Sequence, residues 1–381
     1  MSTLDADAPP LRTRDARIDS LRGLMLAEIA LVHLRCPFAL AAYELFGRVS
    51  PAAGFVFLSG LVAGGVYSRK AEQGAAAITL RCVRRAVYID VYHVLAFVAL
   101  LAIAAVQPKF NTYFQFDIGQ SHKDALSALG GFAVWAYQPD LFDILPMYGL
   151  FVLCMPAALL ALCRGQGHAM LLVSLSVWAL AQVGLGHISS NTDHFGFFQG
   201  DFNPFAWQLV FFSGLYFGHM HLYQGVRVVA IWPALVAASL LVCLMGLTMR
   251  WNLLPWPASF GPDGWLASKQ NYGPAYLVNF LAFAYLVYCL GTLLPRALEW
   301  PPLAFLGRHS IQVFSFHVVA VYLAIPLAWR VAEQGPWAYN VLGAALVMSL
   351  FVPAWCHARW RASRASKASK AAQSAKPAFV K

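Results

Sequence analysis

Charged side chains are scarce in this sequence. Only 12% of its 381 residues are charged and 60% are hydrophobic, and the charged share is about half of that usual in soluble proteins. A soluble fold of this size needs more polar surface than that to cover its core. The scarcity excludes a soluble enzyme, a disordered chain and a nucleic-acid-binding domain, and indicates a polytopic membrane protein. The net charge of +10 does not change this, because most basic residues flank apolar runs.

Familiar soluble-type sites are also missing. The seven cysteines include no C-x-x-C pair, so a zinc site, a redox motif and a disulfide framework lack support. We therefore expect no metal. The sequence has no GxSxG, Walker loop, HExxH or GxGxxG in the right context, and no signal-peptide pattern at its N-terminus.

What the sequence does contain is long apolar runs. A membrane-spanning helix needs about 20 mostly apolar residues, and ten segments qualify. They are 18–38, 49–68, 84–106, 141–163, 169–187, 203–222, 229–249, 272–294, 303–328 and 337–358. A shorter piece, 124–136, is expected to lie in the membrane interface. The string GLVAGG at 60–65 falls inside the second run and is interpreted as a helix-packing motif.

These runs predict an all-α polytopic membrane protein with about ten transmembrane helices. We expect a cytoplasmic segment over 1–17, one ten-helix domain over 18–358, and a basic disordered tail over 359–381. With both termini in the cytoplasm, 20 of the 27 Lys and Arg residues face that side and seven face the other. This asymmetry obeys the positive-inside rule. The tail would anchor the chain on anionic lipid.

The first run carries four ionisable residues: Asp19, Arg22, Glu28 and His33. Such groups are costly in lipid and are candidate functional residues. At about 100° per residue, Arg22 and His33 lie about 20° apart on the helix, and Asp19 lies about 60° from Arg22. The three share a stripe, whereas Glu28 points away from it. Structural alternatives remain for each: a packed histidine, an Asp19–Arg22 ion pair, and a buried glutamate that only donates or accepts a hydrogen bond.

A second basic group lies where the third run begins. Arg81, Arg84 and Arg85 are expected at the start of a cytoplasmic helix, where free N–H groups would help them bind phosphates. Positive-inside anchoring is the alternative. His93 follows Asp90 by three residues, and the two are either a satisfied polar pair or part of a tunnel.

Polar residues also gather at the opposite, outer level. Asp143 begins the fourth run at the level of His33, and Asn203, Trp207 and Gln208 open the sixth. A carboxylate near an imidazole would raise its basicity, and Trp with amides suits sugar hydroxyls. An interfacial Trp with a capping Asn is the alternative. The ninth run carries Arg308 and His309 near the cytoplasm and His317 near its middle.

Five segments resemble one known family, in order along the chain. They are RIDSLRG (17–23), GFVFLSGLVAGGVY (54–67), FDILPMY (142–148), FNPFAWQLVFFSG (202–214) and LGRHSIQVFSFH (306–317). On these residues the chain resembles the OpgC family, bacterial inner-membrane proteins that succinylate osmoregulated periplasmic glucans. That family is similar to the acyltransferase-3 transmembrane enzymes.

The wider group carries Arg–x10–His on its first span, matched by Arg22 and His33, and Arg-x-x-Arg at its third, matched by Arg81 and Arg84. One position departs from the pattern. Sequences of the OpgC type often place Asp directly before the first-span His, where this chain has Val32. Asp143 or Glu28 would then have to partner the histidine.

The resemblance implies transfer of an acyl group, expected to be succinyl, from cytoplasmic acyl-CoA to hydroxyls of a periplasmic glucan. Arginines of the third span, with Arg308 and His93, would hold the donor, and His33 would be the catalytic base. Asn203, Trp207, Gln208 and Ser59 would contact substrate, with Ser59 or His33 the nucleophile if an acyl-enzyme forms. Another envelope polysaccharide as acceptor, or a non-enzymatic sugar or anion transporter, stay open. The acyl group, glucan linkage and oligomeric state are not determined by the sequence.

Overall fold

The computed structural model describes residues 15–107, 125–186, 200–261 and 264–374. Within these ranges the chain is helical and has no β-strand. Its helices are α1 (Ala16–His33), α2 (Pro37–Ala42), α3 (Pro51–Ala71), α4 (Ala75–Val106), α6 (Ala125–Ala133), α7 (Ile144–Cys163), α8 (Gly167–Gln182), α9 (Pro204–Phe217), α10 (Pro233–Arg250), α11 (Pro274–Leu293), α12 (Pro301–Arg308), α13 (Ser310–Ala332), α14 (Pro336–Ser349) and α15 (Phe351–Ser374). A π-helical turn, η2 (Gly218–Tyr223), continues α9.

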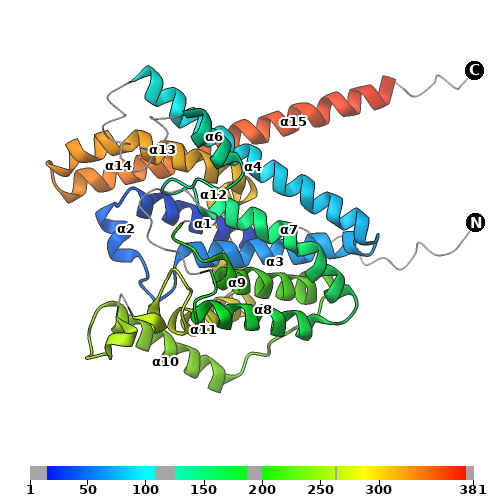
Figure 1. Cartoon of the computed structure of the whole chain (residues 1–381), viewed down its shortest axis with the longest axis vertical. Coiled ribbons are helices and arrows are strands. Elements are labelled where there is room, and N and C mark those ends of the chain that lie inside the picture. The colour runs from blue at the N-terminus through cyan, green and yellow to red at the C-terminus, as the bar shows by residue number, and fades with distance from the viewer. Residues whose placement is uncertain (1–14, 108–124, 187–199, 262–263, 375–381) are drawn as a thin grey trace, which may run out of the picture.

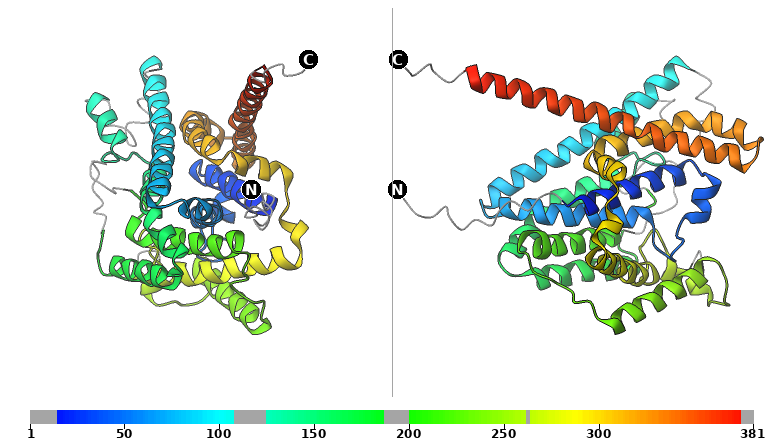
Figure 2. Two further views of the ribbon diagram at one scale, coloured as in Figure 1. Left: turned by 90° about the vertical axis from the view of Figure 1, so that its right-hand side faces the viewer. Right: turned by 180° about the vertical axis from the view of Figure 1, so that it is seen from behind.

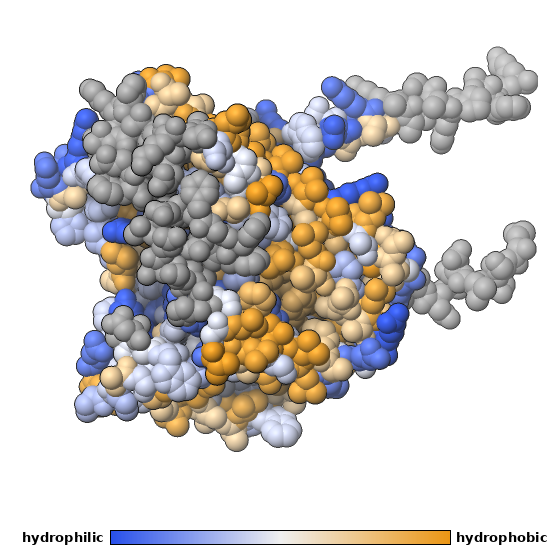
Figure 3. Space-filling view, in the orientation of Figure 1, coloured by the Kyte–Doolittle hydropathy of each residue, from blue (hydrophilic) through white to orange (hydrophobic). Residues whose placement is uncertain are grey.

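The fold is that of a multi-pass membrane protein. Seven helices of the described residues are long and apolar enough to cross a bilayer. Figure 3 shows a broad apolar band across the middle of the molecule, with hydrophilic residues at its left and right edges. The predicted all-helical membrane class is thus confirmed. The count of ten stays a prediction, because α8 and α9 have only 16 and 14 residues and α1 carries several charges.

The long helices run roughly side by side, with α1 and α3 in the middle (Figures 1 and 2). α7, α8 and α9 lie on one side of this pair, and α12 to α15 lie on the other. α1 begins, and α15 ends, at the right of Figure 1, and this side is here called the basic face. The opposite side, where α1 ends and α7 begins, is called the histidine face.

Glycines allow the central helices to touch. Gly60 and Gly64 of α3 face Gly214 of α9 and Gly218 of η2, so closely that a Cβ on Gly60 would lie 2.1 Å from the Phe211 carbonyl oxygen. Small residues four apart let two helix backbones approach in this way. The interpretation of residues 60–65 as a packing motif therefore holds.

Two boundaries differ from those predicted. The predicted 84–106 segment begins earlier, at Ala75, because a run of alanines follows Gly74, whose φ of 104° stops the preceding turn. The tail predicted to be disordered from residue 359 instead continues α15 to Ser374. Arginines there lie over tryptophans four residues earlier, Arg359 over Trp355 and Arg364 over Trp360, at 4.2 and 4.5 Å from the ring centres. Such i,i+4 cation–π contacts stabilise a helix.

Candidate active site

Two histidines meet at the histidine face. His33 is the last residue of α1, and its Nδ1 lies 3.1 Å from Nε2 of His317 in α13. The other ring nitrogen of His317, Nδ1, contacts the carbonyl oxygen of Phe314. A carbonyl only accepts, so Nδ1 of His317 carries the proton and its Nε2 accepts from His33. This leaves Nε2 of His33 unprotonated, which is the state that a general base needs.

The His33 ring lines a small cavity of about 40 Å³, here called the outer cavity. That volume has room for a few water molecules. Residues from several parts of the chain surround it, chiefly His33, Tyr43, Asp143, Phe202, Lys269 and Phe314. The cavity therefore joins the end of α1 with the beginning of α7 and the loop before α11.

Asp143 precedes α7 and lies at the wall of this cavity. Its Oδ2 accepts a hydrogen bond of 2.7 Å from the backbone N–H of Asp201. Burial, followed by the charge of Asp201, raises the pKa of Asp143 to about 7. Among the described residues the hydrogen-bond partner of His33 is His317, and neither Asp143 nor Glu28 takes that place.

Lys269 brings a cation to the outer cavity. Its Nζ lies 5.3 Å from the ring centre of Tyr43 and 5.9 Å from that of Phe202. Within the described part of the chain it forms no ion pair. Lysine over aromatic faces is held by cation–π attraction while its ammonium can still bind an anion.

The residues predicted to hold sugar have a different role in the structure. The indole Nε1 of Trp207 donates to the carbonyls of Lys269 and Gln270, at 3.2 and 3.1 Å. Asn203 caps α9 and donates from Nδ2 to Asn271. Gln208 accepts from the Ser174 hydroxyl and donates to the Ser174 carbonyl. These side chains are buried and their polar atoms are engaged. Trp207 and Asn203 hold the loop that carries Lys269, whereas Gln208 ties α9 to α8.

A second cavity, here called the basic pocket, lies toward the basic face. Its volume is about 250 Å³. Four arginines and a histidine line it: Arg22, Arg85, Arg308, Arg361 and His357. Ser59 lines it as well, and its buried hydroxyl has no hydrogen-bond partner in the described residues.

The buried arginine of the first-span stripe lies at this pocket. Arg22 donates to the Ser310 hydroxyl at 2.7 Å, and Asp19 pairs with Arg308 at 3.5 Å. α1 and α12 bring these groups together because they cross closely: a Cβ on Gly307 would lie 1.9 Å from the Asp19 carbonyl oxygen. Of the predicted stripe on α1, Arg22 lines the basic pocket and His33 lines the outer cavity.

The predicted donor residues of α4 do not all share this pocket. Arg85 lines it, whereas Arg81 and Arg84 are exposed. The idea that free N–H groups assist them is wrong, because α4 begins at Ala75 and its first turn ends before Arg81. His93 is fully buried and its ring stacks on Phe132 at 3.9 Å. Asp90 accepts a hydrogen bond from Trp135, so of the two alternatives for Asp90 and His93 the polar pair is not formed.

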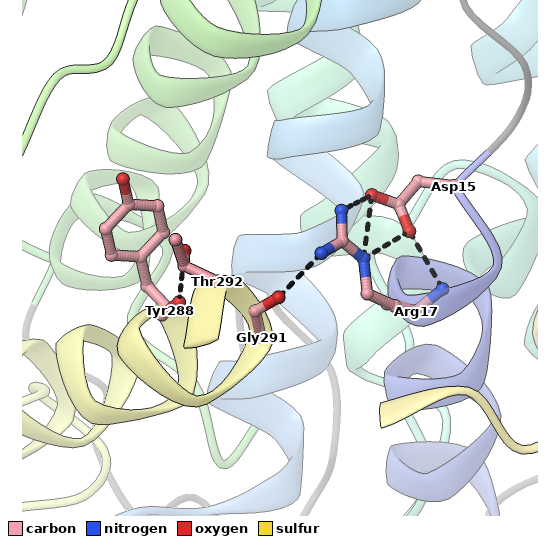
Figure 4. A network of polar contacts seen from close by, with 5 residues as sticks. All are labelled: Asp15, Arg17, Tyr288, Gly291 and Thr292. Carbon is pink, nitrogen blue, oxygen red and sulfur yellow. Dashed lines mark hydrogen bonds and ion pairs between the residues drawn. The ribbon is translucent and has the colours of Figure 1, made fainter. Parts of the chain in front are cut away.

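Beside the basic pocket, the start of α1 is tied to the end of α11. Arg17 donates to both carboxylate oxygens of Asp15 and, at 2.7 Å, to the Gly291 carbonyl (Figure 4). Burial alone would raise the pKa of Asp15, but these hydrogen bonds lower it overall. Asp15 and Arg17 also line a wide hollow of about 800 Å³, which shares Val62 and Val66 with the basic pocket. The basic pocket therefore opens toward the basic face.

Two phenylalanines separate the cavities. The guanidinium of Arg22 lies 5.8 Å from the ring centre of Phe55, whose ring stacks on Phe314 at 6.0 Å. Phe314 in turn packs on His317 at 4.6 Å, and His317 contacts His33. A continuous series of side-chain contacts thus links the basic pocket to the histidine pair.

Sequence reasoning missed three parts of this site: His317 as the partner of His33, Lys269, and the α15 residues Arg361 and His357. His317 had a signal, since it is an imidazole inside an apolar run and ends one of the matched segments. Lys269 and Arg361 had none that separates them from other loop and tail cations. No group of His, Cys, Asp or Glu suited to a metal ion occurs within the described residues.

These features define a class: a multi-pass helical membrane protein with a basic pocket and a histidine-lined cavity toward opposite ends of its central helices. A family model described as OpgC protein matches residues 14–362, nearly the whole chain. The protein therefore belongs to the OpgC family, and this membership indicates a glucan-modifying acyltransferase. No curated protein and no solved structure matches the chain.

Proposed function

We propose that this protein transfers a succinyl or similar acyl group from acyl-CoA to hydroxyls of periplasmic glucans, across the bacterial inner membrane. The observation that carries the proposal is the linear order of the two cavities along α1. At one end Arg22 lines a pocket whose guanidinium groups could bind phosphate, and at the other end His33 could act as a base. The basic face would lie in the cytoplasm, where acyl-CoA is, and the histidine face in the periplasm.

The basic pocket suits the phosphates of the donor. Guanidinium groups bind phosphate through short, charge-assisted and often bidentate hydrogen bonds. Arg85, Arg308 and Arg361 come from three helices and converge on one pocket, and such convergence exceeds what positive-inside anchoring requires. The adjoining hollow would accept the rest of the nucleotide.

The acyl arm must then pass Phe55 and Phe314. Both rings are buried and stack on each other, so they would close the passage before the donor binds. Rotation of the two rings would let the arm extend beside Arg22 toward the histidine pair. The closed state would also keep water and ions from crossing between the faces.

The chemistry at the outer cavity follows from the proton arrangement. Nε2 of His33 takes the proton from a glucan hydroxyl as its oxygen attacks the thioester carbonyl carbon. The C–S bond then breaks, the ester forms, and the departing CoA sulfur takes the proton from His33. His317 holds His33 in the required tautomer and stabilises its protonated form through the shared hydrogen bond. Asp143 would accept a hydrogen bond from the acceptor sugar.

The experiment that tests the proposal is acyl transfer by the purified full-length protein. It would be incubated with radiolabelled succinyl-CoA and periplasmic glucan, with His33→Ala as the matched inactive control. Label recovered as an alkali-labile ester on the glucan supports the proposal. Transfer only to another envelope polysaccharide would change the acceptor, and uptake of sugar or anion into vesicles without transfer would replace the enzyme with a transporter.

A further inference from the structure

Lys269 has no role in the reaction just described, although it lines the outer cavity. Among the described residues that line this cavity, Lys269 and His33 are the basic ones. The basic pocket and its arginines lie on the other side of the two phenylalanines. Lys269 would therefore be the cation available to a negatively charged group of a ligand that binds beside the histidine pair.

The loop is built so that this ammonium is held in place. Trp207 binds the carbonyl of Lys269 itself, and the backbone N–H of Asn203 binds the next carbonyl, at 3.0 Å. Tyr43 and Phe202 flank the side chain. Asp143 lines the same cavity and interacts with Lys269 electrostatically, but no carboxylate of the described residues lies within ion-pair distance of this ammonium.

We propose that Lys269 selects donors whose acyl group ends in a carboxylate, by pairing with that carboxylate while the thioester lies at His33. The inference rests on the proposed function and specifies its substrate class. An ionised carboxylate is not stable in a small, largely enclosed space unless a cation and hydrogen bonds meet it. The outer cavity is small enough that a group beside His33 is also close to the other residues of its wall.

The test compares two donors of the same length. Succinyl-CoA and butyryl-CoA differ in whether the four-carbon acyl group ends in a carboxylate or a methyl. Lys269→Gln should lower kcat/KM for succinyl-CoA by roughly 10- to 150-fold, the range of one charge-assisted hydrogen bond. The rate with butyryl-CoA should change little, and Lys269→Arg should keep much of the preference. Arg330→Gln removes an exposed charge at the end of α13 and is the control.

Equal losses with both donors would overturn the inference, because Lys269 would then serve the reaction in general. An unchanged donor ratio in Lys269→Gln would overturn it as well. A second measurement does not depend on turnover: monomethyl succinate, but not methyl butyrate, should raise the unfolding temperature of the wild type, and the effect should vanish in Lys269→Gln. Absence of acyl transfer by the wild type would end the proposed function, while the ligand result would still decide on carboxylate binding.

Discussion

At the scale of single residues, the two hydrogen bonds of His317 set the chemistry of the site. They fix the proton on Nδ1 of His33 and leave its Nε2 unprotonated, as the proposed base requires. We predict that His33→Ala lowers kcat by about 10²–10⁴-fold, the usual contribution of a general base. His317→Ala should lower kcat less, because the base remains but its tautomer is no longer fixed. Donor KM should stay unchanged in both.

The matched control for this pair is His93→Phe. His93 stacks on Phe132, and its ring nitrogens have no partner in the described residues, so an apolar ring can replace it. Turnover would be measured for all three variants in one detergent, after equal folding is confirmed by their unfolding temperatures. Normal turnover by His33→Ala would rule out the mechanism.

The neighbouring arginines of α4 give a second test at this scale. Arg85 lines the basic pocket and Arg84 is exposed beside it. Arg85→Gln should raise the KM for acyl-CoA by about tenfold, near the lower limit for a charge-assisted contact. Arg84→Gln should have little effect, because Arg84 does not line the pocket. It removes the same charge one position away and is therefore the matched control. Steady-state kinetics with varied acyl-CoA would show the difference, and equal effects would return both residues to a topological role.

At the scale of helices, α3 and α13 each place one phenylalanine ring between Arg22 and the histidine pair, and we propose that these rings close the route between the cavities. We predict that Phe55→Ala, or the milder Phe55→Leu, lets a membrane-impermeant thiol reagent added at the basic face reach a cysteine placed at Ala52, which lines the outer cavity. The reason is that loss of the ring leaves a gap where Phe55 stacked on Phe314. Labelling would be followed by mass spectrometry in sealed inside-out vesicles.

Phe57 of the same helix supplies the control. It packs on Phe217 and Phe280, away from the two cavities, so Phe57→Ala should leave the labelling unchanged. Protein that lacks the added cysteine gives the background from the seven native ones. Rapid labelling without any change at Phe55 would mean that the phenylalanines do not close the route.

At the scale of the whole molecule, orientation is the property to test. The 20-to-7 distribution of basic residues predicts that 69–83 and 359–381 face the cytoplasm and 107–140 the periplasm. A cysteine-accessibility map of intact cells should therefore label the last region and spare the first two. Periplasmic labelling beside Lys70 would mean that the orientation is the reverse of the predicted one. The basic pocket would then face away from the cytoplasm, where acyl-CoA is.

The sequence by itself determined the helical membrane class and the stripe of Asp19, Arg22 and His33. Both depend on local properties, the length of apolar runs and the periodicity of one helix. The start of α4 and the end of α15 were not predicted correctly from the sequence. They depend on the backbone conformation of Gly74 and on contacts such as that of Arg359 with Trp355, which composition does not show.

Only the tertiary structure decided which side chains share a cavity. His33 and His317 are 284 residues apart, and their contact depends on how α1 and α13 pack. Trp207 was predicted to bind sugar because the sequence shows that an indole N–H donor is present. The sequence does not show that the loop carbonyl of Lys269 accepts this N–H. In the sequence nothing distinguishes Lys269 from other basic loop residues. Only the fold of this loop shows that Lys269 lines the outer cavity. A pairing between distant residues is set by packing of the whole chain, and local sequence carries no record of it.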